Sequence, residues 1–285
     1  MRICHTVQEV RDFVRAVRAE GPVGLVPTMG YFHDGHMALM HRARRECRTV
    51  VVSIYVNPLQ FGPQEDFRTY PRDPERDLCL AEAAGVDAVF MPADAEMYPP
   101  GYSTYVEVEG LTDKLCGRSR PGHFRGVATV VTKIFNIVRP DRAYFGEKDF
   151  QQALVIKRLV ADLNMDLEVV TVPTVREPDG LAMSSRNVYL NPEERLAATV
   201  LYRSLRRARD AILAGERDPE RIRKCLAATI SAERLAELDY AEVYGLPWLA
   251  DLSRLEGDVL LAVAARFGRA RLIDNLVVKV PSAEG

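Results

Sequence analysis

Short apolar runs alternate with segments in which apolar residues recur every three or four positions through the first two-thirds of the chain. Residues 23–28 and 49–56 form runs rich in β-branched side chains, which is typical of strands buried on both faces of a parallel sheet. Between them, the apolar side chains of residues 36–47 recur at helical spacing, so we expect a helix there. The pattern therefore predicts an alternating series of strands and helices.

This alternation continues to residue 172. It predicts further helices over residues 74–84, 124–138 and 149–163, and further strands over residues 86–91, 142–145 and 167–172. Strands separated by helices form a doubly wound parallel sheet, because the connecting helices cover its two faces. We therefore expect an α/β domain over residues 1–174, with ligands beyond the carboxyl ends of its strands.

The pattern changes from about residue 175. It predicts a long helix over residues 192–214, a second from 219 to at least 228, and strands over 238–244, 259–265 and 271–278. This succession predicts a smaller C-terminal α+β domain over residues 175–285 that carries the loop at 183–187.

Composition narrows the possible functions. A chain of 285 residues is long enough for two domains. Because its net charge of −2 gives no broad basic face, we do not expect nucleic acid as a partner. No apolar run approaches the roughly 18 residues of a membrane span, and the charged N-terminus has no signal-peptide pattern. The five cysteines are scattered and lack zinc-site spacing, so we expect reduced thiols of a cytoplasmic protein, mostly in the core.

Two histidines and two glycines occupy the predicted turn after the strand 23–28, where residues 29–36 read MGYFHDGH. A helix N-terminus attracts anions through its unpaired N–H groups and the positive end of its dipole. His33 and His36 add donors, while Gly30 and Gly35 lack a Cβ that would keep a nucleotide from the backbone. The chain has neither a G-x-x-x-x-G-K-[ST] loop nor a G-x-G-x-x-G turn, so ATP would bind through His-x-Gly-His. The alternative is an ordinary surface turn.

A second polar element, residues 183–187, reads MSSRN and follows a turn at residues 177–180. Two hydroxyls and a guanidinium on a loop suit a triphosphate whose charge grows during transfer. The alternative is a capping loop for the helix expected from residue 192, with Asn191 as its N-cap.

Together these elements resemble the HIGH and KMSKS signatures of the nucleotidylyl-transferase superfamily. Several separate blocks in order are more specific than any one motif. Six stretches resemble the pantothenate synthetase family and stand in its order: PTMG at 27–30, NPLQF at 57–61, YPR at 70–72, GHFRG at 122–126, FGEKD at 145–149 and DGLAMSSRN at 179–187. The small departures are Phe32, where the family usually has Leu, and Val188, at a variable position.

The resemblance implies a Rossmann-like fold and an ATP-dependent ligase of coenzyme A biosynthesis. Its reaction would condense (R)-pantoate with β-alanine to pantothenate through a pantoyl-adenylate, releasing AMP and pyrophosphate. Mg²⁺ would accompany ATP, held largely by phosphates and water rather than by protein ligands, and no organic cofactor would be tightly bound. The family is typically dimeric, so we expect a homodimer here.

The resemblance also implies roles for individual residues. His36 would donate to the phosphate in the transition state, and His33 would hold the triphosphate together with the N–H groups beside Met29 and Gly30. Val175 would contact adenine through its backbone. The implied ATP-binding residues are Met29, Gly30, Tyr31, Phe32, His33, Asp34, Gly35, His36, Gly146, Glu147, Lys148, Asp149, Val175, Met183, Ser184, Ser185 and Arg186.

In the same family pattern, Lys148 and Arg186 would neutralise the β and γ phosphates, and Ser184 and Ser185 would donate hydrogen bonds. Read alone, Lys148 and Asp149 could equally mark a helix start with exposed charge.

Two glutamines match the family's pantoate-binding positions. Gln60 and Gln152 carry carboxamides, whose donor and acceptor faces can bind a hydroxy acid without adding charge. Gln60 would also lie near the β-alanine site, whereas Gln152 could instead be a solvated helix residue. The sequence assigns no role to His123.

The proline-rich connection at residues 58–74 is long for a loop inside a compact domain. Connections of this length are often lids or binding loops, and the alternative is a merely exposed loop. Three other functions remain open: an adenylyltransferase that keeps the adenylate as product, a class I aminoacyl-tRNA synthetase, and a nucleotide sensor without catalysis. A synthetase should carry a basic tRNA-binding domain, and a sensor would not need both histidines with Lys148, Ser185 and Arg186.

Overall fold

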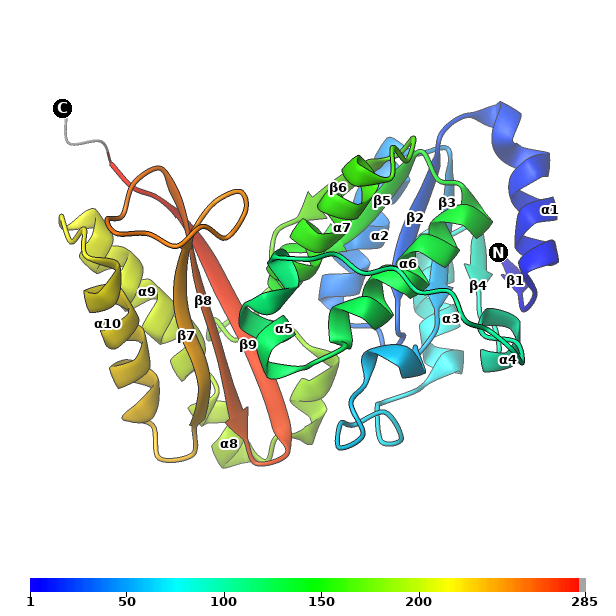
Figure 1. Cartoon of the computed structure of the whole chain (residues 1–285). Coiled ribbons are helices and arrows are strands. Elements are labelled where there is room, and N and C mark those ends of the chain that lie inside the picture. The colour runs from blue at the N-terminus through cyan, green and yellow to red at the C-terminus, as the bar shows by residue number, and fades with distance from the viewer. Residues whose placement is uncertain (282–285) are drawn as a thin grey trace. The chain divides into compact units, whose positions relative to one another are not determined.

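The computed structural model describes residues 1–281, and the chain divides into two compact units (Figure 1). The first unit comprises Met1–Glu147 and Gln151–Thr174, and the second comprises Lys148–Phe150 and Val175–Gly285. The short segment Lys148–Phe150 therefore groups with the second unit, although the chain on both sides of it belongs to the first.

The first unit contains a six-stranded parallel sheet in the order β1-β4-β3-β2-β5-β6. Its strands are β1 (Arg2–Cys4), β2 (Val23–Thr28), β3 (Thr49–Ile54), β4 (Ala88–Phe90), β5 (Arg142–Gly146) and β6 (Glu168–Val172). The helices of this part are α1 (Val7–Val17), α2 (Asp34–Glu46), α3 (Pro74–Ala83), α4 (Asp94–Met97), α5 (Leu115–Ser119), α6 (His123–Val138) and α7 (Phe150–Asp162). This arrangement confirms the expected doubly wound α/β class.

The direction in which strands are added reverses between β2 and β5. In doubly wound sheets, ligands bind beyond the carboxyl ends of the strands at such a reversal. The His-x-Gly-His turn follows β2 directly, so the topology puts it at the place where this fold binds ligands.

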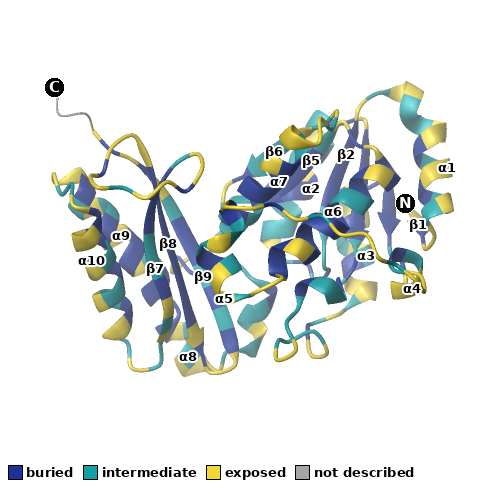
Figure 2. Cartoon of the chain, viewed as in Figure 1, coloured by how far each residue is buried: buried dark blue, intermediate teal, exposed yellow. Residues whose placement is uncertain are grey.

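Both faces of this sheet are covered by helices (Figure 2). On one face, Val26, Val50 and Val89 are fully buried and belong to one cluster with Met40 of α2 and Ala81 of α3. α6 buries most of its residues, as the dark colour along it in Figure 2 indicates. Within residues 1–281, no helix is both long and apolar enough to cross a bilayer.

Most predicted elements of this unit are present with shifted ends. β2 has the predicted bounds, while α2 begins at Asp34, two residues before the predicted start at residue 36. The shift arises because the His33 side chain itself caps the helix. β1 and α1 were not predicted, although Thr6 and Glu9 form a capping box at the start of α1.

The second unit contains an antiparallel sheet in the order β7-β8-β9 and a layer of helices. Its elements are α8 (Pro192–Ala197), α9 (Val200–Leu213), α10 (Pro219–Ser231), β7 (Glu237–Gly245), β8 (Asp258–Phe267) and β9 (Ala270–Lys279). Their apolar side chains form a separate core that includes Leu201, Ile212, Leu226 and Val263. Short 3₁₀ turns occur in both units at η1 (Arg18–Glu20), η2 (Pro58–Gln60), η3 (Leu111–Asp113), η4 (Glu147–Asp149) and η5 (Ser185–Tyr189).

The prediction of one long helix over residues 192–214 is wrong, because α8 and α9 are separate. At the break, the Leu201 N–H donates to the Ala198 carbonyl, and the Thr199 hydroxyl donates to the Leu196 carbonyl at 2.7 Å. Tightened turns and hydroxyls bonded to the preceding turn both interrupt regular helix geometry. Asn191 does cap α8, as the alternative interpretation of this loop predicted.

Candidate active site

The turn after β2 is held by a buried carboxylate from α3. Gly30 and Tyr31 have left-handed φ angles of 82° and 53°. This conformation directs two successive N–H groups toward Asp77, whose carboxylate accepts from Tyr31 N at 2.6 Å and from Phe32 N at 2.7 Å. Burial raises the pKa of Asp77, while these two donors act against that rise. Asp77 therefore fixes the backbone of the turn.

The two glycines of the motif are required for contacts within the protein. A Cβ at Gly30 would lie 2.8 Å from Asp77 Oδ2, and one at Gly35 would lie 2.7 Å from Cε1 of His33. The Gly30 N–H donates to Thr28 Oγ1 at 3.1 Å, so the phosphate contact expected from it would compete with an internal bond. These glycines therefore make room for Asp77 and His33. That they also make room for a nucleotide stays a prediction.

The two motif histidines form a reciprocal cap at the start of α2. His33 Nδ1 accepts from Gly35 N at 3.1 Å, and His36 Nδ1 accepts from His33 N at 3.3 Å. An imidazole that accepts at Nδ1 in its neutral form carries its proton on Nε2. The rings lie with centroids 4.2 Å apart. Both side chains therefore have the tautomer that donates from Nε2, as binding to phosphate oxygens requires.

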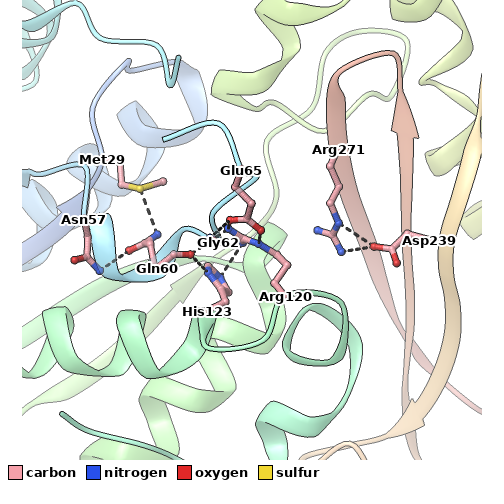
Figure 3. A network of polar contacts seen from close by, with 9 residues as sticks. All are labelled: Met29, Asn57, Gln60, Gly62, Glu65, Arg120, His123, Asp239 and Arg271. Atoms are coloured by element: carbon pink, nitrogen blue, oxygen red, sulfur yellow. Dashed lines mark hydrogen bonds and ion pairs between the residues drawn. The ribbon is translucent and has the colours of Figure 1, made fainter. Parts of the chain in front are cut away.

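Gln60 lies in a buried polar network beside the motif (Figure 3). Its Oε1 accepts from Asn57 Nδ2 at 3.1 Å, and its Nε2 lies 3.3 Å from Met29 Sδ. Asn57 also donates to the Gly126 carbonyl at 3.1 Å. A Cβ at Gly126 would lie 2.4 Å from the Leu59 carbonyl oxygen, so α6 packs directly on the backbone that carries Gln60.

The carbonyl of Gln60 is held by a second set of contacts, also drawn in Figure 3. His123 Nδ1 lies 2.9 Å from this oxygen, and Arg120 Nη2 lies 3.4 Å from it. Arg120 donates to both carboxylate oxygens of Glu65 at 2.6 Å, and Glu65 Oε2 accepts from Gly62 N at 3.2 Å. Burial alone would raise the pKa of Glu65, but Arg120 outweighs it and holds that pKa below its ordinary value.

The loop at residues 58–74 is thus tied down from within the first unit. The ion pair between Glu65 and Arg120 is shielded, with side chains 26% and 14% exposed. His123, to which the sequence assigned no role, proves to be buried and to hold the Gln60 backbone.

In the second unit, β9 anchors the segments that carry Lys148 and the MSSRN loop. Asn275 Nδ2 donates to the Lys148 carbonyl at 2.9 Å. The neighbouring Asp274 accepts from Arg176 at 2.6 and 2.8 Å, and Arg176 also donates to the Gly180 carbonyl at 3.1 Å. Burial raises the pKa of Asp274, against the effect of the Arg176 guanidinium. Two adjacent residues of one strand therefore fix both segments.

The MSSRN loop is closed by a short hairpin. Met183 N donates to the Val175 carbonyl at 3.0 Å, next to the isolated bridge between Arg176 and Ala182. Ser184 Oγ accepts from Arg186 N at 3.2 Å and caps the 3₁₀ turn η5. The hydroxyl of Ser184 thus has a structural function besides the one expected of it.

Comparison with known proteins decides which family these features belong to. A family model described as pantoate-beta-alanine ligase matches residues 2–277. The pantothenate synthetase of Pelotomaculum thermopropionicum is 62% identical over 279 residues, which cover 98% of this chain and 99% of that protein. The chain belongs to the pantoate-beta-alanine ligase family.

Solved structures of pantoate-beta-alanine ligases agree with this membership. The pantothenate synthetase of Thermus thermophilus has a TM-score of 0.92 and 52% identity, covering 97% of this chain and 99% of that one. The enzyme of Francisella tularensis, crystallised with beta-gamma ATP and beta-alanine, has a TM-score of 0.79 and 33% identity, with 97% of each chain covered. The family resemblance stated from the motifs is confirmed.

Within each unit, the structure brings together some of the residues predicted for this ligase. The first unit places Met29 beside Gln60 and His33 beside His36. Lys148 lies 3.7 Å from Asp149, and its side chain is 21% exposed. Gln152 on α7 is partly buried, whereas its neighbour Gln151 is buried and holds the Cys116 N–H and the Leu111 and Lys114 carbonyls.

Several residues that shape this site were not found from the sequence. Most of their partners are distant in the chain, so local spacing does not mark these contacts; the bond from Asn57 to Gln60 spans only three residues. They are Asp77, Asn57, Arg120, His123, Asp274 and Asn275. Asn57 and His123 do lie in motif blocks that the family resemblance used, and that was the one available signal.

Proposed function

We propose that this chain makes pantothenate from (R)-pantoate and β-alanine, with conversion of ATP to AMP and pyrophosphate. Family membership over residues 2–277 supports this proposal, and so do the names of the relatives. The observation that carries it is the His-x-Gly-His turn at the end of β2, where both imidazoles are oriented to donate from Nε2.

The first step activates the acid, because a carboxylate oxygen is a poor leaving group. A pantoate carboxylate oxygen attacks the α-phosphorus of ATP, and the bond from that phosphorus to the bridging oxygen breaks with loss of pyrophosphate. Such a transfer needs positioning and charge stabilisation more than covalent help. His36 Nε2–H donates to the phosphate in the transition state, and His33 holds the triphosphate.

The charge that develops on pyrophosphate is neutralised by Lys148 and Arg186, with hydrogen bonds from Ser184 and Ser185. Mg²⁺ bound to ATP would offset part of the phosphate charge. Among residues 1–281, no group of three or more His, Cys, Asp or Glu side chains is placed to hold a metal ion.

The second step forms the amide. The neutral amine of β-alanine attacks the acyl carbon of the adenylate, the bond from that carbon to the phosphate oxygen breaks, and AMP leaves as the nitrogen loses a proton. Gln60 and Gln152 bind pantoate, and Gln60 also lies near β-alanine. The Francisella tularensis relative binds beta-alanine and beta-gamma ATP, which supports these substrates.

The remaining ATP contacts follow the family pattern. The adenine contacts the backbone of Val175, and the nucleotide contacts residues that follow β5 and residues of the MSSRN loop. These are Gly146, Glu147, Lys148, Asp149, Met183, Ser184, Ser185 and Arg186, together with residues 29–36. A cytoplasmic homodimer, with residues 1–174 and 175–285 as its two domains, completes the proposal.

A product assay by mass spectrometry tests this function. ATP, pantoate and β-alanine together should give pantothenate and AMP in equal amounts, and omission of any one should abolish pantothenate. Accumulation of a pantoyl-adenylate that β-alanine cannot consume would instead identify an adenylyltransferase. No nucleotide turnover with any combination would favour a sensor.

A further inference from the structure

Tyr98, which lies just after α4, makes a short contact with the network around Gln60. Its hydroxyl donates to Asn57 Oδ1 at 2.7 Å, and Asn57 in turn donates to Gln60 Oε1 at 3.1 Å. The result is a chain of hydrogen bonds from an aromatic side chain to a carboxamide that the proposed function assigns to the acid. The reaction steps described above give no role to Tyr98 or to its bond with Asn57.

The orientation of Asn57 follows from its neighbours. Its Oδ1 faces two donors, the Tyr98 hydroxyl at 2.7 Å and the Leu59 N–H at 3.4 Å. Its Nδ2 faces two acceptors, Gln60 Oε1 and the Gly126 carbonyl, each at 3.1 Å. A flipped amide would set oxygen against oxygen at Gly126 and a donor against the Leu59 N–H. Of the two bonds to Oδ1, the one from Tyr98 is the short one.

The orientation of Gln60 follows in turn. Because Oε1 accepts from Asn57, the amide must present Nε2, whose partner within the protein is the thioether of Met29 at 3.3 Å. A thioether is a weak acceptor, so a carboxylate or hydroxyl oxygen of a substrate can take these hydrogens instead. Asn57 is 1% exposed and Gln60 is 8% exposed, so water competes little for either group.

Tyr98 is itself held in place and kept protonated. Its ring lies between Tyr55 and Tyr102, with centroids 6.3 and 5.0 Å away, and Lys133 Nζ lies 5.6 Å from the ring centroid. Burial is the main cause that raises the pKa of Tyr98, so its hydroxyl stays a donor through the neutral range.

We propose that Tyr98 is a positioning residue for the acid substrate: through Asn57 it fixes the Gln60 carboxamide with its N–H groups directed at acceptor oxygens of the acid. This inference rests on the proposed role of Gln60 in pantoate binding. It predicts that the site selects acids whose acceptor oxygens can bind the Gln60 Nε2 group. This selection should depend on the Tyr98 hydroxyl, which acts through Asn57 rather than by contact with the substrate.

The first test replaces Tyr98 by Phe, which removes the hydroxyl and keeps the ring. The KM for pantoate should rise about fivefold, the factor that corresponds to about 1 kcal/mol for one lost neutral hydrogen bond. The KM for ATP should stay within about twofold of wild type, and the melting temperature should fall by no more than about 4 °C, as loss of about 1 kcal/mol predicts for a unit of this size. Tyr102→Phe is the matched control, because the Tyr102 hydroxyl has no hydrogen-bond partner among residues 1–281. Equal pantoate KM values for Tyr98→Phe and wild type would contradict the inference.

A double-mutant cycle separates positioning from a general structural effect. In a Gln60→Ala background, Tyr98→Phe should cause no further rise in pantoate KM, because it acts through the missing carboxamide. Additive effects would show that Tyr98 acts elsewhere. Asn57→Asp gives an independent test, since it keeps an acceptor for Tyr98 but cannot donate to Gln60, and it should raise the pantoate KM at least ~10-fold. An unchanged KM in this variant would also contradict the inference.

The same experiments separate failure of this inference from failure of the proposed function. If Gln60→Ala raises the pantoate KM but Tyr98→Phe does not, only the positioning role of Tyr98 is wrong. If the wild-type protein makes no pantothenate at all, the proposed function is wrong, and the positioning role falls with it.

Discussion

The carboxylate of Asp77 offers a direct way to test how the nucleotide motif is built. Asp77→Asn keeps the size of the side chain but leaves one acceptor for two N–H donors, those of Tyr31 and Phe32. The amide nitrogen must then face one of these donors. Because Asp77 is 1% exposed, water does not readily replace the lost bond.

The expected loss of stability follows from opposing contributions. A hydrogen bond to a charged group contributes about 1.5–3 kcal/mol, and an unsatisfied buried N–H costs about 1–3 kcal/mol more. Relief of the desolvation that raises the pKa of Asp77 offsets part of this loss. We therefore expect the free energy of unfolding of the first unit to fall by about 2 kcal/mol, which corresponds to a drop of about 4–8 °C in its melting temperature.

The functional effect should be larger than the stability effect suggests. Tyr31 has a left-handed φ of 53°, which costs a non-glycine residue about 1–2 kcal/mol and which the Asp77 carboxylate compensates. Without that carboxylate, the turn should relax and the ATP–pyrophosphate exchange rate should fall at least ~10-fold at a temperature where the variant is folded.

Urea denaturation and exchange kinetics on the same preparations measure both effects. Glu75→Gln is the matched control, because Glu75 is exposed in the first turn of the same helix, and it should change neither. Unchanged stability in Asp77→Asn would refute the hydrogen-bond reasoning. Lost stability with normal exchange would refute the link between this turn and catalysis.

Three further predictions concern other contacts. His36→Ala should fold normally by circular dichroism but slow adenylation at least ~10²-fold, and near-normal turnover would remove its phosphate role. Asp274→Asn should lower the stability of the second unit by about 3 kcal/mol in urea denaturation, because it removes the charged partner of the largely buried Arg176 and one of the two side-chain oxygens to which Arg176 donates. Asp210→Asn on the surface should cost under about 0.5 kcal/mol. Glu65→Gln breaks the ion pair with Arg120 and should speed tryptic cleavage after Arg68 about fivefold or more at pH 7. The pKa of Glu65 lies below its ordinary 4.5. The wild-type ion pair should therefore persist above pH 4.5 and be lost as the pH falls through that lowered pKa. Equal cleavage of both proteins at pH 7 would show that this pair does not restrain the loop.

Local patterns in the sequence predicted most of the sheet. The strand Val23–Thr28 was predicted with its observed bounds because its apolar run ends where the motif begins. The prediction of one helix over residues 192–214 was wrong because the spacing of apolar residues does not show the bond from the Thr199 hydroxyl to the Leu196 carbonyl. The missed helix α1 is different, since the capping box at Thr6 and Glu9 was readable from the chain.

The site was predicted to the extent that its residues lie in short motifs. His33, His36 and Gln60 were found this way, but groups that hold the backbone beside them come from distant parts of the chain. Asp77 is separated by 46 residues from Tyr31, and His123 by 63 from Gln60. Periodicity and spacing report on neighbours in sequence, so these supporting contacts required the fold.

Isotope exchange between pyrophosphate and ATP is the most direct test of the central claim that the reaction passes through a pantoyl-adenylate. Labelled pyrophosphate should enter ATP when pantoate is present and β-alanine is absent, because the first step is reversible while the adenylate stays bound. Lys148→Ala should depress this exchange sharply, and β-alanine should drain the intermediate and release AMP with pantothenate. Exchange that does not depend on pantoate, or ADP as the nucleotide product, would contradict the mechanism even if pantothenate were formed.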